Sequence, residues 1–506
     1  MKKTNSTSFV TAGLLLGIFM AAIDNTIVAT AMGTIVGDLG NYEQFVWVTA
    51  GYMVAMMAGM PIYGKLSDMY GRKRFFVFGL LMFLLGSVLC GLSQTMNQLI
   101  AFRIIQGIGG GALMPIAFTI IFDLFPPEKR GKMTGLIGAV FGLSSVLGPL
   151  LGAFITEALS WHWIFYINVP IGAVALFLIA RYYKETMEAS KQKIDWLGAG
   201  SLVLAVSCLM FALELGGGTY SWGSPTILLL FAAAAVLFTV FTFAERKAEE
   251  PIISFWMFKK RLFATSQLIA FAYGGTFVLL AVFIPIFVQA VFGGTASDAG
   301  TTLMPMMLGS VVGSMIGGAL QTKISFRAMM VFSGVCFFTG MALLATMGTD
   351  VTRIALAFYI ALAGLGVGFS FSLLPAASIN QLSPRFRGSA NSTNSFLRSF
   401  GMTVGLAVFG TVQTLSFTNR LNGAFKEAPI QVENQNLQEL FTPEGRAQIP
   451  PDVLSTITEA MSDSITFIFS LALIPIAIAL VAAFFMGNDK VETSKSMKRN
   501  PSSSET

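Results

Sequence analysis

The sequence has few charged residues and almost no histidine or cysteine. Only 11% of its 506 residues are Asp, Glu, Lys or Arg, against about 25% in soluble domains. A water-soluble multidomain enzyme could not cover its surface with so little charge. The one histidine is His162, and the three cysteines (Cys90, Cys208 and Cys336) lie in apolar runs without metal-ligand or disulfide spacing. We therefore expect no metal site and no disulfide framework.

Sites for nucleotides and catalysis are also missing. The run from Gly59 to Lys65 has the spacing of a phosphate loop, but Leu66 replaces the required Ser or Thr and no strand precedes it. The run from Gly107 to Ala112 has the spacing of a dinucleotide fingerprint inside an apolar helix. No catalytic triad signature is visible. We expect a protein that is not an enzyme and has no cofactor.

Long hydrophobic runs are abundant. Hydrophobic residues make up 54% of the chain, and a membrane helix needs about 20 apolar residues in succession. The sequence predicts an all-α polytopic membrane protein with 14 transmembrane helices. The predicted spans are 9–31, 44–63, 75–93, 99–122, 133–156, 164–182, 196–215, 226–244, 263–288, 300–321, 328–347, 353–378, 389–412 and 463–486.

Lysine and arginine alternate between the loops. With the N-terminus placed in the cytoplasm, 26 of the 32 basic residues fall in cytoplasmic loops and tails, as the positive-inside rule requires. The remaining six are Arg103, Arg353, Arg398, Arg420, Lys426 and Arg446. The net charge of +6 thus reflects topology and not nucleic-acid binding. Both termini are predicted to be cytoplasmic, in a plasma (inner) membrane.

An internal repeat divides the chain. Adding 257 to the positions of Gly107, Gly109 and Gly111 gives Gly364, Gly366 and Gly368, and Arg130-Gly131 maps onto Arg387-Gly388. This predicts two six-helix halves with a helix pair inserted between them. The predicted domains are residues 1–195 (N-terminal half), 196–262 (inserted pair and cytoplasmic linker), 263–486 (C-terminal half, with an outer segment 413–462) and 487–506 (disordered tail).

The most specific motif follows the second span and is called here the Gly64–Arg74 turn. It reads Gly-Lys-Leu-Ser-Asp-Met-Tyr-Gly-Arg-Lys-Arg and resembles the signature of the major facilitator superfamily. The resemblance implies a conformational latch whose Asp contacts the start of a helix in the other half, here near Gly388. We expect the basic residues to anchor the turn to the inner leaflet. A degenerate copy after the tenth span has Thr322 in place of the Asp. The latch residues are Gly64, Asp68, Gly71, Arg72 and Lys73.

Asp24 lies deep in the first span. A lone carboxylate at that depth has its pKa raised by desolvation and can bind a proton or a cation in turn. Its surroundings, Asp-Asn-Thr-Ile-Val, resemble a motif of the fourteen-span drug–proton antiporters, and Arg103 with Gln106 resembles the R-x-x-Q-G element near that family's proton path. The alternatives are a packing Asp bonded to Thr26 or Arg103, and a structural Arg bonded to backbone carbonyls.

Two further motifs resemble this family. Gly142, Gly148, Pro149 and Gly152 match its antiporter signature, with Ala153 as a mild departure. Glycines four apart let a neighbouring helix approach closely, so tight packing is the alternative. The run from Trp161 to Pro170 also matches, but His162 stands where the family usually has Arg. His162 is a pH sensor or an interfacial residue among aromatics.

Other residues are candidates on position alone. Glu214 and Arg398 join the predicted proton and substrate path, although Glu214 could be merely interfacial. Met53, Met56, Met57 and Met60 form a stripe on one helix face. Methionines adapt to varied ligand shapes and suit a substrate pocket, but a packed interior is the favoured interpretation of the stripe.

Together these residues predict a proton-coupled antiporter. The resemblance implies export of lipophilic, often cationic compounds by alternating access, with protons as the coupling ion. The partners are small-molecule substrates, protons and the lipid bilayer, with no nucleic acid, and the protein is expected to be a monomer. The alternatives are a permease of the same fold for a metabolite, siderophore or nutrient, and a membrane sensor that does not transport.

Overall fold

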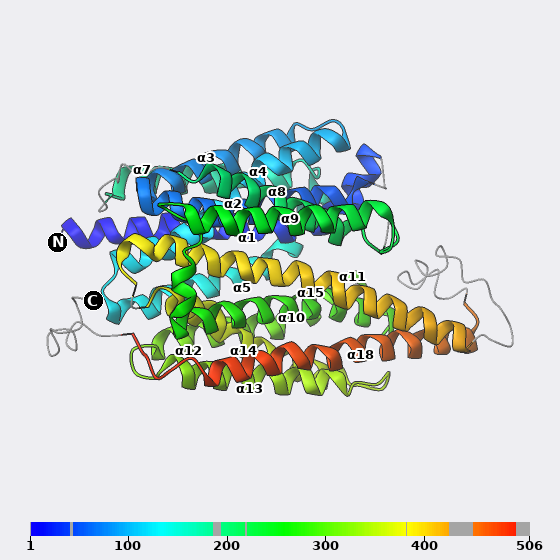
Figure 1. Cartoon of the computed structure of the whole chain (residues 1–506). Coiled ribbons are helices and arrows are strands. Elements are labelled where there is room, and N and C mark those ends of the chain that lie inside the picture. The colour runs from blue at the N-terminus through cyan, green and yellow to red at the C-terminus, as the bar shows by residue number, and fades with distance from the viewer. Residues whose placement is uncertain are drawn as a thin grey trace.

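The computed structural model describes residues 2–40, 44–185, 194–217, 220–380, 382–424 and 449–491. Across these residues the chain is helical, and 14 helices are long and apolar enough to cross a membrane. The predicted number of spans is therefore confirmed. Figure 1 shows the helices as a bundle with their long axes roughly parallel.

The chain forms the following helices. They are α1 (Lys2–Leu39), α2 (Val46–Tyr70), α3 (Arg72–Gly91), α4 (Met96–Leu124), α5 (Pro127–Ala158), α6 (Trp163–Tyr166), α7 (Asn168–Tyr182), α8 (Trp196–Leu215), α9 (Pro225–Lys247), η2 (Phe255–Lys259), α10 (Arg261–Ala290), α11 (Ala296–Thr302), α12 (Met304–Leu320), α13 (Phe326–Ala345), α14 (Arg353–Ile379), η3 (Pro384–Phe386), α15 (Arg387–Ala424) and α18 (Pro451–Phe484).

Local sequence explains several helix ends. The side chains of Thr95, Ser224 and Thr352 each accept the backbone N–H three residues on, at the starts of α4, α9 and α14. Such caps satisfy donors that the helix itself leaves free. Gly71 separates α2 from α3 with a φ of 102°, which favours glycine.

The repeat appears as two sets of matching glycine contacts. In α4, a Cβ at Gly107 or Gly111 would overlap backbone carbonyls of α2, and one at Gly109 would overlap the backbone of α3. In α14, the equivalent glycines meet the backbones of α12 and α13 in the same way. Each half thus packs a glycine-lined helix between two neighbours.

The two halves meet through two helix pairs. Glycines of α5, including Gly131 and Gly138, lie against α12, and Gly64 of α2 lies against Ser392 of α15. The end of the bundle that holds the Gly64–Arg74 turn is called here the Asp68 end. At that end α15 begins against α2, whereas near its last turns Arg420 pairs with Asp463 of α18 at 2.6 Å. α15 therefore runs obliquely across the molecule (Figure 1).

The inserted pair consists of α8 and α9, which pack against each other. α8 also packs on α2, where the rings of Trp47 and Phe211 lie 5.1 Å apart. Met210, Leu202 and Val206 of α8 share a buried cluster with Met57 and Met60. Few apolar side chains of α9 are buried (Ile227, Ala234 and Phe241), as expected of a helix that faces lipid.

Two sequence predictions about the segments after α14 need correction. The predicted outer segment 413–462 is not a separate flap at its edges, because α15 continues to Ala424 and α18 already begins at Pro451. Residues 425–448 lie outside the described part. The tail was expected to be disordered from residue 487, but Asp489 O accepts from Phe326 N and Val491 N donates to Gln321 O. The remainder, 492–506, is not described.

Candidate functional site

A network of buried polar side chains surrounds Asp24 in the N-terminal half. The Asp24 carboxylate pairs with Arg103 Nη1 at 2.5 Å and accepts hydrogen bonds from Gln106 Nε2 at 2.8 Å and Asn168 Nδ2 at 3.0 Å. Ser87 Oγ accepts from both Gln106 and Asn168. The network joins α1, α3, α4 and α7, and all five side chains belong to residues with no exposed surface.

Arg103 has further contacts that hold its guanidinium in place. Nη1 also donates to Gln106 Oε1 at 2.7 Å, and Nε donates to the Val48 carbonyl at 3.3 Å. The guanidinium carbon lies 4.1 Å from the ring centroid of Tyr52. A buried charge needs a partner and further hydrogen bonds, and this cation has both.

The structure corrects one expectation and brings together three predicted residues. Asp24 is not a lone carboxylate, because Arg103 neutralises it directly. The alternative of an Asp bonded to Arg103 describes this conformation, and the bond to the Val48 carbonyl matches the structural alternative for Arg103. Asn168 and Ser87 were missed, although Asn168 lies within the run from Trp161 to Pro170 that resembles the antiporters. Whether the network carries protons stays a prediction.

A second polar cluster joins the halves at the Asp68 end. The Asp68 carboxylate accepts the backbone N–H of Gly388 at 2.9 Å and of Ser389 at 2.8 Å. These residues lie in the first turn of α15, where the helix has free donors and a partial positive charge. The contact expected near Gly388 is therefore present. Gly64 is needed beside it, because a Cβ there would overlap Ser392.

Arg72 extends this cluster into the seam between the halves. Its guanidinium forms ion pairs with Asp68 and Asp123 and donates to the Pro384 carbonyl at 2.8 Å. Asp123 in turn accepts from Arg387 at 3.0 Å. Arg72 has no exposed surface, so the expectation that it anchors the turn to the leaflet is wrong.

The residues beside Arg72 have other roles. Lys73 Nζ donates to the Ala180 carbonyl at 2.6 Å, within the N-terminal half. Burial raises the pKa of the Tyr183 phenol. Tyr183 therefore stays neutral and leaves the carboxylates as the counterions of Arg72.

Sequence reasoning missed Glu250, which lies in the linker after α9. Its carboxylate binds Lys65 Nζ of the N-terminal half at 2.6 Å and also pairs with Arg385 of the C-terminal half. Glu245 holds this linker by accepting the N–H groups of Ile252 and Ile253. The inserted segment thus contributes a carboxylate to the seam. A single acidic residue in a linker gives no signal of this kind in sequence.

The glycines of the predicted antiporter motif face two different helices. A Cβ at Gly148 or Gly152 would overlap Thr26 or Thr30 of α1, whereas one at Gly142 would overlap Val311 of α12. Pro149 lies inside α5, which continues on both sides of it. The motif thus brings α5 close to α1 within its own half and to α12 across the seam. Its role in antiport stays a prediction.

Arg398 and the methionine stripe lie near the seam. Arg398 donates to the Ser370 carbonyl at 3.1 Å and lies over the ring of Phe371, which stacks on Phe141 of α5. Met57 and Met60 are buried, and the Met57 sulfur accepts from Thr403 of α15 at 3.8 Å. Met53 and Met56 pack against the core of the N-terminal half. Substrate contact by these residues stays a prediction.

The remaining predicted positions lie towards the opposite end. His162 stacks on Trp161 with ring centroids 3.7 Å apart, and Trp161 Nε1 donates to Asp38 at 2.8 Å. This matches an interfacial position among aromatics. Glu214 lines a cavity between α8 and α15. The described residues contain no group of three or more His, Cys, Asp or Glu side chains placed to hold a metal ion.

Comparison with known proteins identifies the family. Residues 14–406 match the model of the Major Facilitator Superfamily. The chain is 66% identical over 503 residues to Multidrug resistance protein 3 of Bacillus subtilis (strain 168), covering 98% of each chain. It is 35% identical over 520 residues to Multidrug transporter protein MdtP of the same organism, covering 98% of this chain and 95% of that protein.

Solved structures agree on the fold. The proton:xylose symporter XylE with bound 6-bromo-6-deoxy-D-glucose aligns with a TM-score of 0.62 at 14% identity, over 98% of this chain and 99% of that one. At that identity the similarity concerns the fold alone. With the matched family model, the paired halves and the identity to the bacterial relatives, the chain belongs to the major facilitator superfamily.

Proposed function

We propose that this membrane-embedded transporter exports lipophilic, often cationic small molecules in exchange for protons. The cargo class is supported by the names of its relatives, which include a multidrug resistance protein and a multidrug transporter. The observation that carries proton coupling is the fully buried Asp24 carboxylate, held by Arg103, Gln106 and Asn168.

The network can act as a switch because the Asp24–Arg103 ion pair is fully buried and shielded from water. Protonation of Asp24 would leave the Arg103 cation without its counterion, and breaking a buried ion pair in this way costs about 3–5 kcal/mol. The protonated and ionised forms therefore favour different packing around α1 and α4. A cationic compound near Asp24 competes with the proton for the same negative charge, which is the basis of exchange.

The Asp68 cluster supports alternating access. Asp68, Arg72 and Glu250 tie the two halves together at one end of the bundle. We infer that this end is cytoplasmic, because most basic loop residues lie there, and that the structure represents the state closed to the cytoplasm. Release of these contacts would let the halves rock about the central network.

The test is proton movement in energised inverted membrane vesicles. In such vesicles the lumen is acidic. Adding a lipophilic cation to the outside should release protons from the lumen, and a protonophore should stop cation movement. The electrical part of the driving force is about 2.3 kcal/mol per charge per 100 mV. The Asp24→Asn variant should lose the proton signal at normal expression.

Three results would contradict the proposal. Protons moving in the same direction as the cation would indicate a permease that works by symport. No transport, with a phenotype indifferent to the proton gradient, would indicate a sensor. Undiminished exchange in the Asp24→Asn variant would remove Asp24 from the coupling mechanism.

A further inference from the structure

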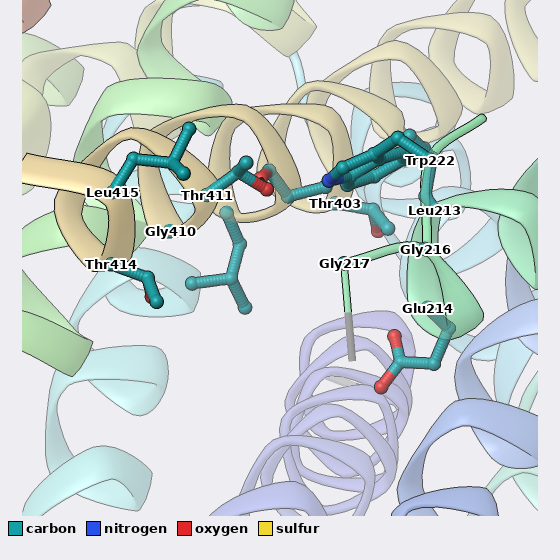
Figure 2. Close-up of a pocket in the computed structure, with 12 residues that line it drawn as sticks. Leu213, Glu214, Gly216, Gly217, Trp222, Thr403, Gly410, Thr411, Thr414 and Leu415 are labelled. Atoms are coloured by element: carbon teal, nitrogen blue, oxygen red, sulfur yellow. Dashed lines mark hydrogen bonds between the residues drawn. The ribbon is translucent and has the colours of Figure 1, made fainter. Parts of the chain in front are cut away.

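A cavity of about 380 Å³ lies between the inserted helix pair and the C-terminal half. It opens at the end of α8 and the turn that follows, and α15 forms its other wall (Figure 2). This volume is within the range of drug-sized ligand sites, about 300–1,000 Å³. The lining residues are Leu213, Glu214, Gly216, Gly217, Trp222, Thr403, Leu406, Ala407, Gly410, Thr411, Thr414 and Leu415.

Glycines shape this cavity from both sides. Gly216 and Gly217 lie directly under the Trp222 indole, since a Cβ on either would overlap the ring, and Gly217 has a φ of +79°. The Gly217 N–H donates to the Tyr220 carbonyl at 2.8 Å, which closes the turn. On α15, a Cβ at Gly410 would meet nothing within 4 Å. The sequence therefore holds an aromatic wall in place and leaves open space opposite it.

Two polar groups of the cavity wall lack partners within the described part of the chain. The Trp222 Nε1–H is buried and makes no hydrogen bond, and the exposed Glu214 carboxylate forms no ion pair or hydrogen bond with another described residue. Figure 2 shows both side chains at the same cavity, with the indole nitrogen edge facing α15. Most buried polar groups are paired, so the unpaired Trp222 donor, in a wall that also carries the Glu214 carboxylate, indicates a place for a ligand.

The chemistry of the wall defines that ligand. The carboxylate favours a cation, and the Trp222 N–H can donate to an acceptor atom. Leu213, Leu406 and Leu415 provide apolar contact. We propose that this cavity is a second binding site, built by the inserted pair and separate from the Asp24 network, for amphipathic organic cations that carry a hydrogen-bond acceptor. The inference rests on the proposed export of such compounds.

The position of the cavity links it to movement of the halves. Thr403 lines the cavity and also donates to the Met57 sulfur of α2 at 3.8 Å. A cation bound here therefore contacts α15 at the point where α15 lies against the N-terminal half. Rocking of the halves would change the cavity wall. This change would favour release of the ligand at the end of the bundle away from the Asp68 end.

The test is equilibrium binding to the whole protein in lipid nanodiscs, without a proton gradient. The probes are rhodamine 6G, a lipophilic cation with an ester carbonyl, and Nile red, an uncharged dye, each followed by fluorescence polarisation. Glu214→Gln should weaken rhodamine 6G binding about fivefold and leave Nile red unchanged. Trp222→Leu, which removes the N–H donor, should weaken rhodamine 6G about threefold or more, and Gly410→Leu, which fills the cavity, by about tenfold or more.

Gly423→Leu is the matched control. It lies on the same helix, a Cβ added there also meets nothing within 4 Å, and it does not line the cavity. Wild-type affinity in all three cavity variants would overturn the proposal, as would equal loss for Nile red in Glu214→Gln or for rhodamine 6G in Gly423→Leu. Failure of proton exchange with normal probe binding would refute the proposed function instead, so the two outcomes can be told apart.

Discussion

The two halves build the same glycine contacts around α4 and α14 but enclose different residues. In the N-terminal half, Arg103 and Gln106 lie on α4 within a charged network. Adding the repeat offset of 257 gives Ile360 and Ala363 on α14, which are both fully buried and apolar. The same frame is therefore stable with an apolar interior. The charges in the N-terminal half are not needed to form the fold, which supports a functional role for them.

The two contacts across the seam differ in a similar way. Asp68 binds the free N–H groups of Gly388 and Ser389, because α15 begins at Arg387 after the short helix η3. The equivalent Gly131 lies inside α5, which already begins at Pro127. Its N–H belongs to the helix, so a carboxylate at the position of Thr322 would have no free donor there. The loss of the acid in the second copy follows from this difference.

The largest expected effect tests the interiors of the two halves. Arg103→Met leaves the buried Asp24 without a counterion and should lower the free energy of unfolding by about 3–5 kcal/mol. Ile360→Met at the equivalent position keeps volume and polarity and should cost less than about 1.5 kcal/mol. Thermal unfolding in detergent measures both.

A double variant sharpens this comparison. Asp24→Leu with Arg103→Met should recover most of the stability, since buried ion pairs can be replaced by apolar side chains, while proton-driven transport stays absent. Equal destabilisation by Arg103→Met and Ile360→Met would contradict the assignment of a special role to the charged interior.

The next effect concerns the seam at the Asp68 end. Asp68→Ala removes two charge-assisted hydrogen bonds from the start of α15 and should disfavour the closed state by about 2 kcal/mol, a roughly 30-fold change in population. Turnover in proteoliposomes should fall, while equilibrium drug binding stays largely intact. A wild-type turnover rate would show that the contact does not control the transport cycle.

A smaller effect is expected for the linker of the inserted pair. Glu250→Gln weakens the ion pair to the half-exposed Arg385, and exposed pairs of this kind contribute up to about 1 kcal/mol. The pair to Lys65 is largely buried, but the Gln amide oxygen can still accept a hydrogen bond from Lys65. We expect turnover to change about threefold. Glu249→Gln, an exposed neighbour, should leave turnover unchanged, and equal effects of the two substitutions would rule out a specific role for Glu250.

The smallest effect is expected when the second copy of the turn is completed. Thr322→Asp restores the acid of the motif, but the donors it would need are used inside α5. Turnover should change less than about twofold, a change of under about 0.5 kcal/mol. A large fall in turnover would mean that the acid introduced by Thr322→Asp forms a new contact between the halves. In that case the start positions of α5 and α15 would not explain why only the first copy of the motif has the acid.

Much of this architecture could be predicted from sequence. The 14 spans follow from the length of the apolar runs, and Asp68 was expected to reach the helix start near Gly388, where it lies. Neither Glu250 nor Asn168 was assigned a role, because their partners are 135 and 144 residues away in the chain. The edges of 413–462 were misassigned because polar residues there continue helices beyond the apolar core.

The sequence by itself determined that the chain crosses a membrane, how often, and that its halves repeat. These properties depend on local composition and on glycine spacing, and both can be read from the sequence of each helix alone. Only the tertiary structure decided that Asp24 is neutralised by Arg103, that Arg72 is buried between acids, and that the inserted pair leaves a cavity beside Trp222. These features depend on which side chains meet when helices far apart in sequence pack together, and the spacing of residues along one helix does not contain that information.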